Sequence, residues 1–478
     1  MQQPEPDVIV NDVHSRLNET RVARILRPTS TDEIVMYVRD AAQPLAIAGG
    51  RHAMGGQQFA SDDLLLDMTG LNHVLAFDPA RGEIEAEAGM MWPALAHWLA
   101  EAQPDRPGAW GIIQKQTGAD DLTIGGAVSA NVHGRVLGHG PIVADVIGLT
   151  VIDAEGIARC CSRTENAELF RLAIGGYGLF GPLTSIRLRL RRRSKVRRTV
   201  RPCAIDAAVP ALEAAAAGGL GYGDFQFAID PGGDDFLRMG ICSTYGPVSA
   251  DTPILADQRA LSREDWETLF WLAHTDPRRA SDAYTGHYLA TDGQLYWSDR
   301  HQFADYHPGY HAALDRRLHA AVAGSEMITE LYVPRPALPA FMADVAADLR
   351  QHGDQVIYGT VRLIERDRET FLAWAREPWA CVVINLHVDH SPDGIHRATK
   401  AFRRLIARAL SYRGSFYLTY HRWATREQVR AAYPQFVSFL REKHRYDPME
   451  RFQSDWYRHY RGMFGEDGNR ATSPRSNP

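Results

Sequence analysis

The stretch that decides the fold of this chain is Gly49-Gly50-Arg51-His52-Ala53-Met54-Gly55-Gly56, which follows a short apolar run at residues 45–48. Glycine has no Cβ atom, so four glycines within eight residues let the backbone approach a ligand closely. Successive backbone N–H groups in such a loop form a concave site for phosphate. A histidine in the middle of the loop adds a reactive nitrogen beside the ligand. The stretch therefore predicts a phosphate-binding loop that also carries chemistry.

The composition is that of an ordinary globular protein with more than one domain. The chain has 478 residues, 45% of them hydrophobic and 23% charged, and a formal net charge of -5. One hydrophobic core rarely supports that length, so we expect two or more domains. The small negative charge gives no reason to expect a nucleic-acid partner. No apolar run is long enough to span a bilayer, so no transmembrane segment is expected.

Cysteine usage and the amino-terminal residues predict a cytoplasmic protein. The five cysteines are odd in number and irregularly spaced, at positions 160, 161, 203, 242 and 381. This pattern argues against a disulfide framework or a zinc site and suits a reducing compartment. Residues 1–6 are polar and acidic, unlike a secretory signal.

Short apolar runs alternate with glycine-rich loops over the first part of the chain. Strands are expected at residues 45–48, 64–68, 82–88, 146–152, 157–161 and 185–190. Ser30 and Glu33 have the spacing of a capping box, which predicts a helix that ends at about residue 42. The composition changes at the basic run Arg187–Arg198, so we place a domain boundary near residue 195. That run is either a solvated domain junction or a contact for an anionic substrate or lipid headgroup.

Two common nucleotide-binding motifs do not fit the glycine loops. A Rossmann loop opens directly into a helix, whereas residues 57–63 and another predicted strand follow Gly56. A P-loop ends in Gly-Lys-Ser/Thr, which is absent from the sequence. Further glycine clusters lie at residues 117–134 and 175–181. Three strand-flanked clusters over about 130 residues indicate one long ligand held by several loops, with simple turns as the alternative for any single cluster.

Together the three glycine segments resemble the FAD-binding domain of the vanillyl-alcohol oxidase and p-cresol methylhydroxylase (PCMH) superfamily. The segment Gly49–His52 resembles the pyrophosphate loop whose histidine carries covalent FAD in alditol oxidases, aldonolactone oxidases and cytokinin dehydrogenases. Thr123–Ala127 with Asn131–Gly134, and then Gly175–Gly181, resemble the second and third FAD-binding segments. The nearest likeness is to the decaprenylphosphoryl-ribose oxidase and alditol or aldonolactone oxidase branches, and it is strongest over residues 20–195.

Departures from the decaprenylphosphoryl-ribose oxidase branch leave the substrate open. That branch has a serine-type residue where His52 stands, and its flavin is not covalently held. It also has a catalytic lysine after a Tyr-Leu-x step, whereas here Tyr417-Leu418-Thr419 leads to Tyr420. The berberine-bridge branch adds a second flavin link through a cysteine, but no cysteine lies between residues 1 and 159. The resemblance therefore implies at most one covalent link.

The resemblance implies FAD as cofactor, with the 8α carbon of its isoalloxazine ring bonded to His52. Such a bond requires an unprotonated imidazole nitrogen, which is available near neutral pH. His133 is expected near the flavin ring, or alternatively as a core histidine bonded to backbone. The residues expected to bind FAD are Gly49, Gly50, Arg51, His52, Ala53, Met54, Gly55, Gln57, Thr117, Gly118, Leu122, Gly125, Gly126, Ser129, Asn131, His133, Gly134 and Gly178.

The catalytic candidates lie in the middle region and in the carboxyl-terminal segment. They are Tyr420, His421, Glu330, Asn385 and His387, each with a structural hydrogen bond as the alternative. Tyr420 takes the place of the lysine by resemblance, and only one of Tyr420 and His421 is expected to face the flavin because neighbouring strand residues point opposite ways. We expect His421 and Arg422 to lower the pKa of Tyr420 enough for it to act as a base.

A metal site is not expected. His307 and His311 are four residues apart, a spacing that binds metals on a helix. Pro308 and Gly309 lie between them, and both residues disfavour a helix.

The predicted fold class is α+β, with a two-subdomain PCMH-type FAD-binding domain and an α+β cap whose antiparallel sheet bears helices on one face. The expected boundaries are an amino-terminal extension at 1–19, the FAD-binding domain at 20–195, a substrate-binding cap at 196–414, a segment returning to the FAD domain at 415–463, and a disordered tail at 464–478.

The predicted function is FAD-dependent oxidation of a CH–OH group in a sugar, polyol, lactone or related alcohol. A base takes the hydroxyl proton while hydride passes to flavin N5. The electron acceptor is oxygen or another, unidentified molecule. Flavin-dependent reduction of a C=C bond, as in sterol-reductase relatives, is the alternative enzyme class, and a non-enzymatic binding module is a third hypothesis.

Overall fold

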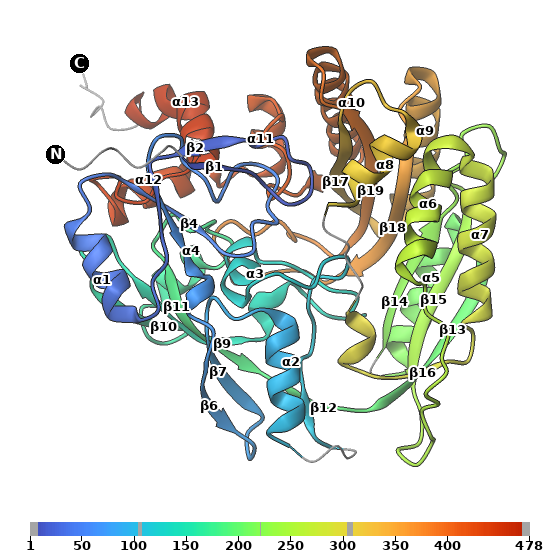
Figure 1. The fold of residues 1–478 in the computed structure, drawn as a ribbon, viewed down its shortest axis with the longest axis horizontal. Coiled ribbons are helices and arrows are strands. Elements are labelled where there is room, and N and C mark those ends of the chain that lie inside the picture. Colours follow the sequence, from blue (N-terminus) through green and yellow to red (C-terminus); the bar gives the residue numbers. More distant parts are fainter. Residues whose placement is uncertain (1–7, 104–107, 220, 304–308, 471–478) are drawn as a thin grey trace, which may run out of the picture.

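The structure, a computed structural model, describes residues 8–103, 108–219, 221–303 and 309–470. Two regions of α+β structure lie side by side (Figure 1). The amino-terminal region contains a three-stranded and a five-stranded sheet besides two two-stranded pairs, and the cap region is built on one eight-stranded sheet. The last segment of the chain packs back against the amino-terminal region.

The first sheet of the amino-terminal region is parallel, with strand order β3-β5-β4. Its strands are β3 (Arg24–Leu26), β4 (Leu45–Ala48) and β5 (Leu64–Asp67), and helix α1 (Thr31–Asp40) connects β3 to β4. The Ser30 hydroxyl caps α1 by accepting the Glu33 N–H, but the Glu33 carboxylate accepts the N–H of Thr29 rather than that of Ser30. Half of the expected capping box is therefore formed. The glycine loop leaves β4 and leads to β5, which is not the Rossmann arrangement.

The second sheet of this region is antiparallel, with order β10-β9-β11-β7-β6. Its strands are β6 (Val74–Asp78), β7 (Glu83–Glu87), β9 (Val146–Ile152), β10 (Ala158–Ser162) and β11 (Leu183–Arg189). Helices α2 (Trp92–Glu101), α3 (Ile124–Ala130) and α4 (Ala167–Ala173) belong to the same region. In β7, Ile84 and Ala86 are buried while the glutamates between them are half-buried, as the alternation in the sequence predicts.

The cap sheet has eight strands in the order β16-β13-β15-β14-β18-β19-β17-β20, all antiparallel. The strands are β13 (Lys195–Ala204), β14 (Tyr222–Phe227), β15 (Met239–Pro247), β16 (Leu295–Trp297), β17 (Gly324–Pro334), β18 (Val356–Ile364), β19 (Trp379–Asp389) and β20 (Ser415–Phe416). The cap helices are α5 (Ile205–Ala217), α6 (Arg263–Thr275), α7 (Pro277–Ala290), α8 (Tyr310–Leu318), α9 (Leu338–His352) and α10 (Pro392–Ser411).

Helices cover both faces of the cap sheet, so the expectation of helices on one face is wrong. On β14, a Cβ atom at Gly223 would lie 2.8 Å from Leu212 of α5. Gln226, of opposite parity on the same strand, donates to the Tyr288 hydroxyl of α7 at 3.1 Å. Residues of opposite parity on a strand point to opposite faces. Helices α6 and α7 therefore lie on the face of the sheet opposite to α5.

The carboxyl-terminal segment joins the two regions. β20 pairs with β17 in the cap, and the Gln453 N–H then donates to the Leu45 carbonyl of β4 at 2.9 Å. The segment continues as α11 (Arg426–Ala432), α12 (Phe436–Tyr446) and α13 (Asp455–Arg470). Helix α13 runs past residue 463, where the tail was expected to begin, and the Phe464 ring packs 5.4 Å from that of Phe436. Residues 471–478 lie outside the described part.

The remaining short elements are β1 (Val8–Val10), β2 (Thr20–Val22), β8 (Trp110–Gly111), β12 (Arg191–Arg192), and the 3-10 turns Met68–Gly70, Ile142–Ala144, Arg300–Gln302 and Arg335–Ala337. β1 pairs with β2, and Val10 and Val22 of this pair pack against residues of β4 and β5 in the first sheet. Among the described residues, no helix combines the length and apolar character needed to cross a bilayer.

Candidate active site

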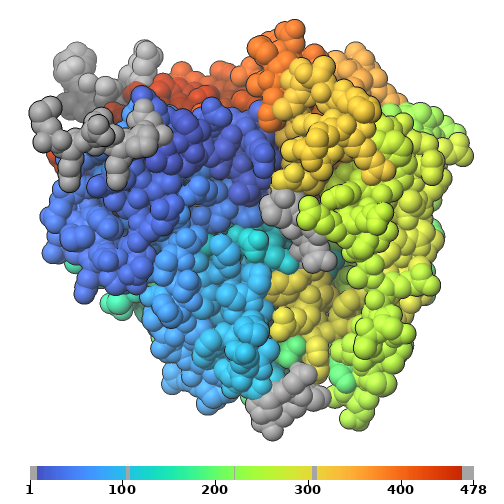
Figure 2. Space-filling model, viewed as in Figure 1, coloured from blue at the N-terminus to red at the C-terminus, as the bar shows by residue number. Residues whose placement is uncertain are grey.

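A cavity of about 560 Å³ lies between the glycine loops and the cap sheet. In the space-filling view, the blue amino-terminal residues and the green-to-yellow cap residues form opposite sides of the visible face (Figure 2). The amino-terminal side of the cavity is lined by the loop after β4 and by the segment around α3. The cap side is lined by residues from β14, β15, β17, β18 and β19 and from helices α6 and α7. We call this cap side the inner face of the sheet.

The two glycine loops pack against each other so closely that side chains are excluded. A Cβ atom on Gly49 would lie 2.1 Å from the Thr123 Oγ1 atom, and one on Gly50 would lie 2.2 Å from the Asp121 carbonyl oxygen. Thr123 also caps α3, since its hydroxyl accepts the Gly126 N–H at 3.1 Å. The glycines are therefore required by a close backbone approach as well as by access to a ligand.

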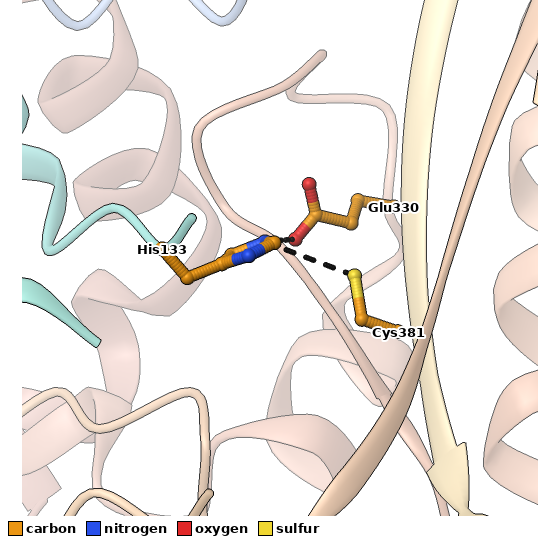
Figure 3. A group of neighbouring side chains, drawn as sticks. All are labelled: His133, Glu330 and Cys381. Atoms are coloured by element: carbon orange, nitrogen blue, oxygen red, sulfur yellow. Dashed lines mark hydrogen bonds and ion pairs between the residues drawn. The ribbon is translucent and has the colours of Figure 1, made fainter. Parts of the chain in front are cut away.

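A buried carboxylate, Glu330 on β17, is the centre of the polar groups at the cavity (Figure 3). Its Oε1 atom lies 2.7 Å from His133 Nε2 and accepts the Tyr332 hydroxyl at 2.5 Å. Its Oε2 atom accepts the Tyr420 hydroxyl at 3.1 Å. Cys381 Sγ lies 3.7 Å from the same His133 nitrogen. We call these five residues the Glu330 centre.

The charge of Glu330 is held in place by its neighbours. Burial raises the pKa of this carboxyl group, but the attraction of His133 and the hydrogen bonds from His133 and Tyr332 outweigh it and lower the pKa to about 2. Glu330 is therefore ionised at any ordinary pH. Burial raises the pKa of the Cys381 thiol well above its usual value.

Tyr420 faces the cavity and His421 does not, but strand alternation is not the reason, because β20 ends at Phe416 and a turn leads to Tyr420. Tyr420 lines the cavity, whereas the His421 ring stacks on Trp423 at 4.1 Å, outside it. The expected lowering of the Tyr420 pKa is wrong in direction. Burial and the neighbouring Glu330 charge raise the pKa of Tyr420 well above its usual value, and they outweigh the opposing effect of Arg362. Tyr420 therefore stays protonated and acts as a hydrogen-bond donor.

Comparison with known proteins identifies the amino-terminal region. Residues 22–162 match the family model described as "FAD binding domain". This chain binds FAD. The matched region belongs to the PCMH-type flavoproteins, the superfamily that the glycine segments predicted.

The relatives match over the same part of the chain. Cytokinin dehydrogenase 4 of Oryza sativa subsp. japonica is 31% identical over 197 residues, which are 37% of this chain and 35% of the relative. Cytokinin dehydrogenase 2 of Arabidopsis thaliana is 30% identical over 192 residues, 38% of this chain and 37% of the relative. L-gulonolactone oxidase of Bos taurus is 27% identical over 166 residues, 34% of this chain and 36% of the relative. The matches thus span about a third of each relative.

The cavity fits FAD on the amino-terminal side. Because the crowded glycines have no side chains, their backbone atoms form part of the cavity wall. At the same wall, the Thr117 Oγ1 and Gln58 Oε1 atoms are buried without a hydrogen-bond partner in the described residues. Polar atoms of this kind are expected where a polar ligand completes the site. The predicted FAD-binding residues that line the cavity are Gly49, Gly50, Arg51, His52, Ala53, Met54, Gln57, Thr117, Gly118, Leu122, Gly125, Gly126, Ser129 and Gly178.

Four of the residues predicted to bind FAD lie behind the cavity wall instead. Asn131 donates to Asp367 at 2.9 Å and so ties the loop to the cap. The Gly134 N–H donates to Gln114, and a Cβ atom on Gly55 would lie 2.4 Å from the Tyr420 carbonyl oxygen. His133 turns toward Glu330. These residues position FAD-binding segments, a role that spacing alone does not separate from direct contact.

His52 lines the FAD cavity in a neutral form. Its Nε2 atom lies 2.9 Å from the Asp121 carbonyl oxygen, and its Nδ1 atom lies 2.9 Å from His14 Nε2. Burial lowers the pKa of His52 to about 4, against the opposing effect of Asp121. A carbonyl only accepts hydrogen bonds, so Nε2 carries the proton and the lone pair is on Nδ1.

Asn385 and His387, the remaining predicted catalytic residues, lie in different surroundings. Asn385 lines the cavity, and its Oδ1 atom is buried without a partner in the described residues. His387 lies outside the lining, with Nδ1 3.2 Å from His274 Nε2. His311 lies in α8 and contacts Glu326 at 2.5 Å, while His307 lies outside the described residues.

Sequence reasoning missed Tyr332, Cys381 and Arg362. Tyr332 is two residues from Glu330 on the same strand face, so alternation contained a signal for it. Cys381 and Arg362 reach the site through strand pairing between distant segments, for which the sequence has no local signal.

Proposed function

We propose that this FAD-binding protein is an oxidoreductase that oxidises a CH–OH group of a small molecule. The observation that carries the proposal is the Glu330 centre, an ionised buried carboxylate that aligns a tyrosine hydroxyl at the FAD cavity. L-gulonolactone oxidase and the cytokinin dehydrogenases are named for different substrates, so the matches alone do not select a substrate class. The polar centre favours a hydroxyl, because such a group both donates and accepts hydrogen bonds.

Bound FAD supplies a two-electron acceptor for hydride from the substrate carbon. The chain's part is to remove the hydroxyl proton. Tyr420 donates its own proton toward Glu330 Oε2, so its oxygen is oriented to accept a hydrogen bond from the substrate hydroxyl. As hydride leaves the carbon, the hydroxyl becomes a strongly acidic protonated carbonyl. Its proton then passes to the Tyr420 oxygen while the Tyr420 proton passes to Glu330.

A carboxylate with a low pKa suffices for this relay, because proton transfer follows the loss of hydride. His133 and Tyr332 form hydrogen bonds with the other carboxylate oxygen, Oε1. These bonds fix the orientation of the carboxylate, and so of the Oε2 lone pair that accepts the Tyr420 hydroxyl. Asn385, whose carbonyl oxygen faces the cavity without a partner in the described residues, is positioned to hold a second polar group of the substrate.

We also propose that His52 forms the single covalent link to FAD. The support is its place in the cavity lining and its neutral ring, since a neutral imidazole has a nucleophilic nitrogen. The nitrogen with the lone pair is Nδ1, so bond formation displaces its present contact with His14.

The test is flavin reduction, followed by absorbance under anaerobic conditions, with polyols, sugars, lactones and aryl alcohols. Bleaching by at least one CH–OH compound, and loss of that bleaching in Glu330→Gln at equal FAD content, supports the proposal. Bleaching by NADPH instead, with oxidation of the flavin by an enone, identifies a C=C reductase. A protein that retains FAD and reacts with neither class is a binding module.

A further inference from the structure

The cap side of the cavity contains buried arginines that the proposed oxidation does not use. Arg198 of β13, Arg362 of β18 and Arg135 line it, together with one carboxylate of β14, Asp224. The rest of this wall is aromatic, with the rings of Tyr245, Tyr284, Tyr288 and Tyr358. Arg198 is 7% exposed and Arg362 is 8% exposed, so both charges are almost removed from bulk solvent.

Two of these arginines have partners. The Arg198 guanidinium lies 4.2 Å from the centre of the Tyr288 ring, and its Nε donates to the Ser243 hydroxyl at 3.0 Å. Arg135 lies 4.9 Å from the centre of the Tyr245 ring and 3.5 Å from Asp224. Rings and hydroxyl groups stabilise a buried cation without neutralising it.

Arg362 differs because it makes no hydrogen bond or ion pair with the described residues, and its Nε atom is buried without a partner. The nearby Glu330 charge attracts it, but both Glu330 oxygens already accept hydrogen bonds from the Glu330 centre. A buried charge is costly unless it is both paired and hydrogen-bonded. The five N–H donors of a guanidinium match the two oxygens of an acid group.

Arg362 lies on the same face of the cap sheet as the Glu330 centre, two strands away from Tyr332. Arg362 stands opposite Cys381 on β19, and Cys381 stands opposite Tyr332 on β17. Residues directly opposite in an antiparallel sheet share a face. Two strand spacings amount to roughly 10 Å, and the long arginine side chain shortens this separation. An acid group bound at Arg362 therefore lies a few bonds from a hydroxyl bound at Tyr420.

We propose that Arg362 is an anchor for an acid group, so that the substrate is a hydroxy acid whose body packs on the tyrosine wall. This inference rests on the proposed function for the hydroxyl, but the anchor itself is a binding property. Arg198 adds positive charge on the same side, whereas the charge of Arg135 is paired with Asp224. The charge of Arg198 favours anions over neutral molecules of the same shape. The FAD pyrophosphate is assigned to the glycine loops on the opposite wall, so it does not use this anchor.

The experiment measures binding of benzoate and of the isosteric neutral benzamide to the FAD-loaded protein by calorimetry. Neither compound has an oxidisable CH–OH group, so the result does not depend on turnover. We expect benzoate to bind at least about tenfold more tightly than benzamide, the usual effect of a charge-assisted hydrogen bond. We expect Arg362→Gln to abolish this preference, with benzamide binding and FAD content unchanged. Phenylphosphonate as a third probe separates a carboxylate site from a phosphate site.

The matched control is Arg259→Gln, because Arg259 also lines the cavity but is exposed. It should leave the preference for benzoate within about twofold, as expected for an exposed charge. Equal binding of benzoate and benzamide to the unaltered protein overturns the anchor, whether or not the variants fold. Loss of FAD from Arg362→Gln also overturns it, because the charge then serves the cofactor. If benzoate binds as expected but no hydroxy acid bleaches the flavin, the proposed oxidation fails and the anchor stands.

Discussion

Replacing Tyr420 by phenylalanine tests the proton relay most directly. The change removes one hydroxyl group at the cavity wall and leaves Glu330 Oε2 without the donor that now lies 3.1 Å away. The ring of Tyr420 is buried, so Tyr420→Phe preserves the packing and the shape of the wall. The carboxylate keeps its bonds to His133 and Tyr332, so Glu330 remains ionised.

The expected magnitude follows from these contacts. Loss of an acid–base group slows the chemical step by a factor on the order of 10² to 10⁴. Loss of a buried hydrogen bond to a charged group costs about 1.5–3 kcal/mol of folding free energy. Substrate binding should change less than the rate of flavin reduction, because the hydroxyl acts chiefly as the bond breaks.

The assay is stopped-flow reduction of the flavin, with FAD content and the free energy of unfolding measured on the same preparations. Tyr457→Phe is the matched control, because the Tyr457 hydroxyl also donates to a glutamate, Glu450, at 3.1 Å but lies outside the cavity. It should lower stability and leave the reduction rate unchanged. In the double variant Tyr420→Phe with Glu330→Gln, the two effects on the rate should be far from additive, since both groups serve one relay.

An unaltered reduction rate in Tyr420→Phe, at normal FAD content, refutes the relay through Tyr420 and leaves Glu330, the ionised carboxylate at the cavity, as the direct proton acceptor. Additive effects in the double variant also contradict it, because they indicate two independent contributions.

Three further predictions concern FAD and pH. Acid-precipitated protein should retain its yellow colour and His52→Ala should release the flavin; flavin that washes out of the unaltered protein rules out the link. Gly50→Ala should lower FAD content, because its Cβ would lie 2.2 Å from the Asp121 carbonyl oxygen, and full retention contradicts the packing argument. Burial raises the pKa of Glu326 from 4.5 to about 7. The fold therefore favours its protonated form, and that stabilisation, about 3 kcal/mol, is complete below pH 4.5 and is lost as pH rises through 7. Glu326→Gln should flatten this part of the unfolding free-energy profile, and an unchanged slope assigns it to another group.

In the cap, sequence patterns could not assign a role to the polar residues of the strands. The strands β18 and β19 are largely apolar with a few polar residues such as Arg362, and β17 contains two polar pairs, one of which includes Glu330. A polar residue in such a run is compatible with a turn, a structural hydrogen bond or an active site. The expected direction of the Tyr420 pKa shift was wrong for the same reason, since the adjacent His421 stacks on Trp423 while Glu330, distant in sequence, lies beside the hydroxyl.

What the sequence by itself determined is the FAD-binding part. Glycine-rich turns and short strands are local properties, so the loop at Gly49–Gly56 with its His52 and the segment around Thr123 were recognisable from residue types and spacing. What only the tertiary structure decided is the chemistry. His133, Glu330 and Tyr420 are separated by 197 and 90 residues along the chain, and they meet because β17 and the carboxyl-terminal segment return to the α3 loop. Such contacts depend on strand register and on the packing of two regions, which no local pattern encodes.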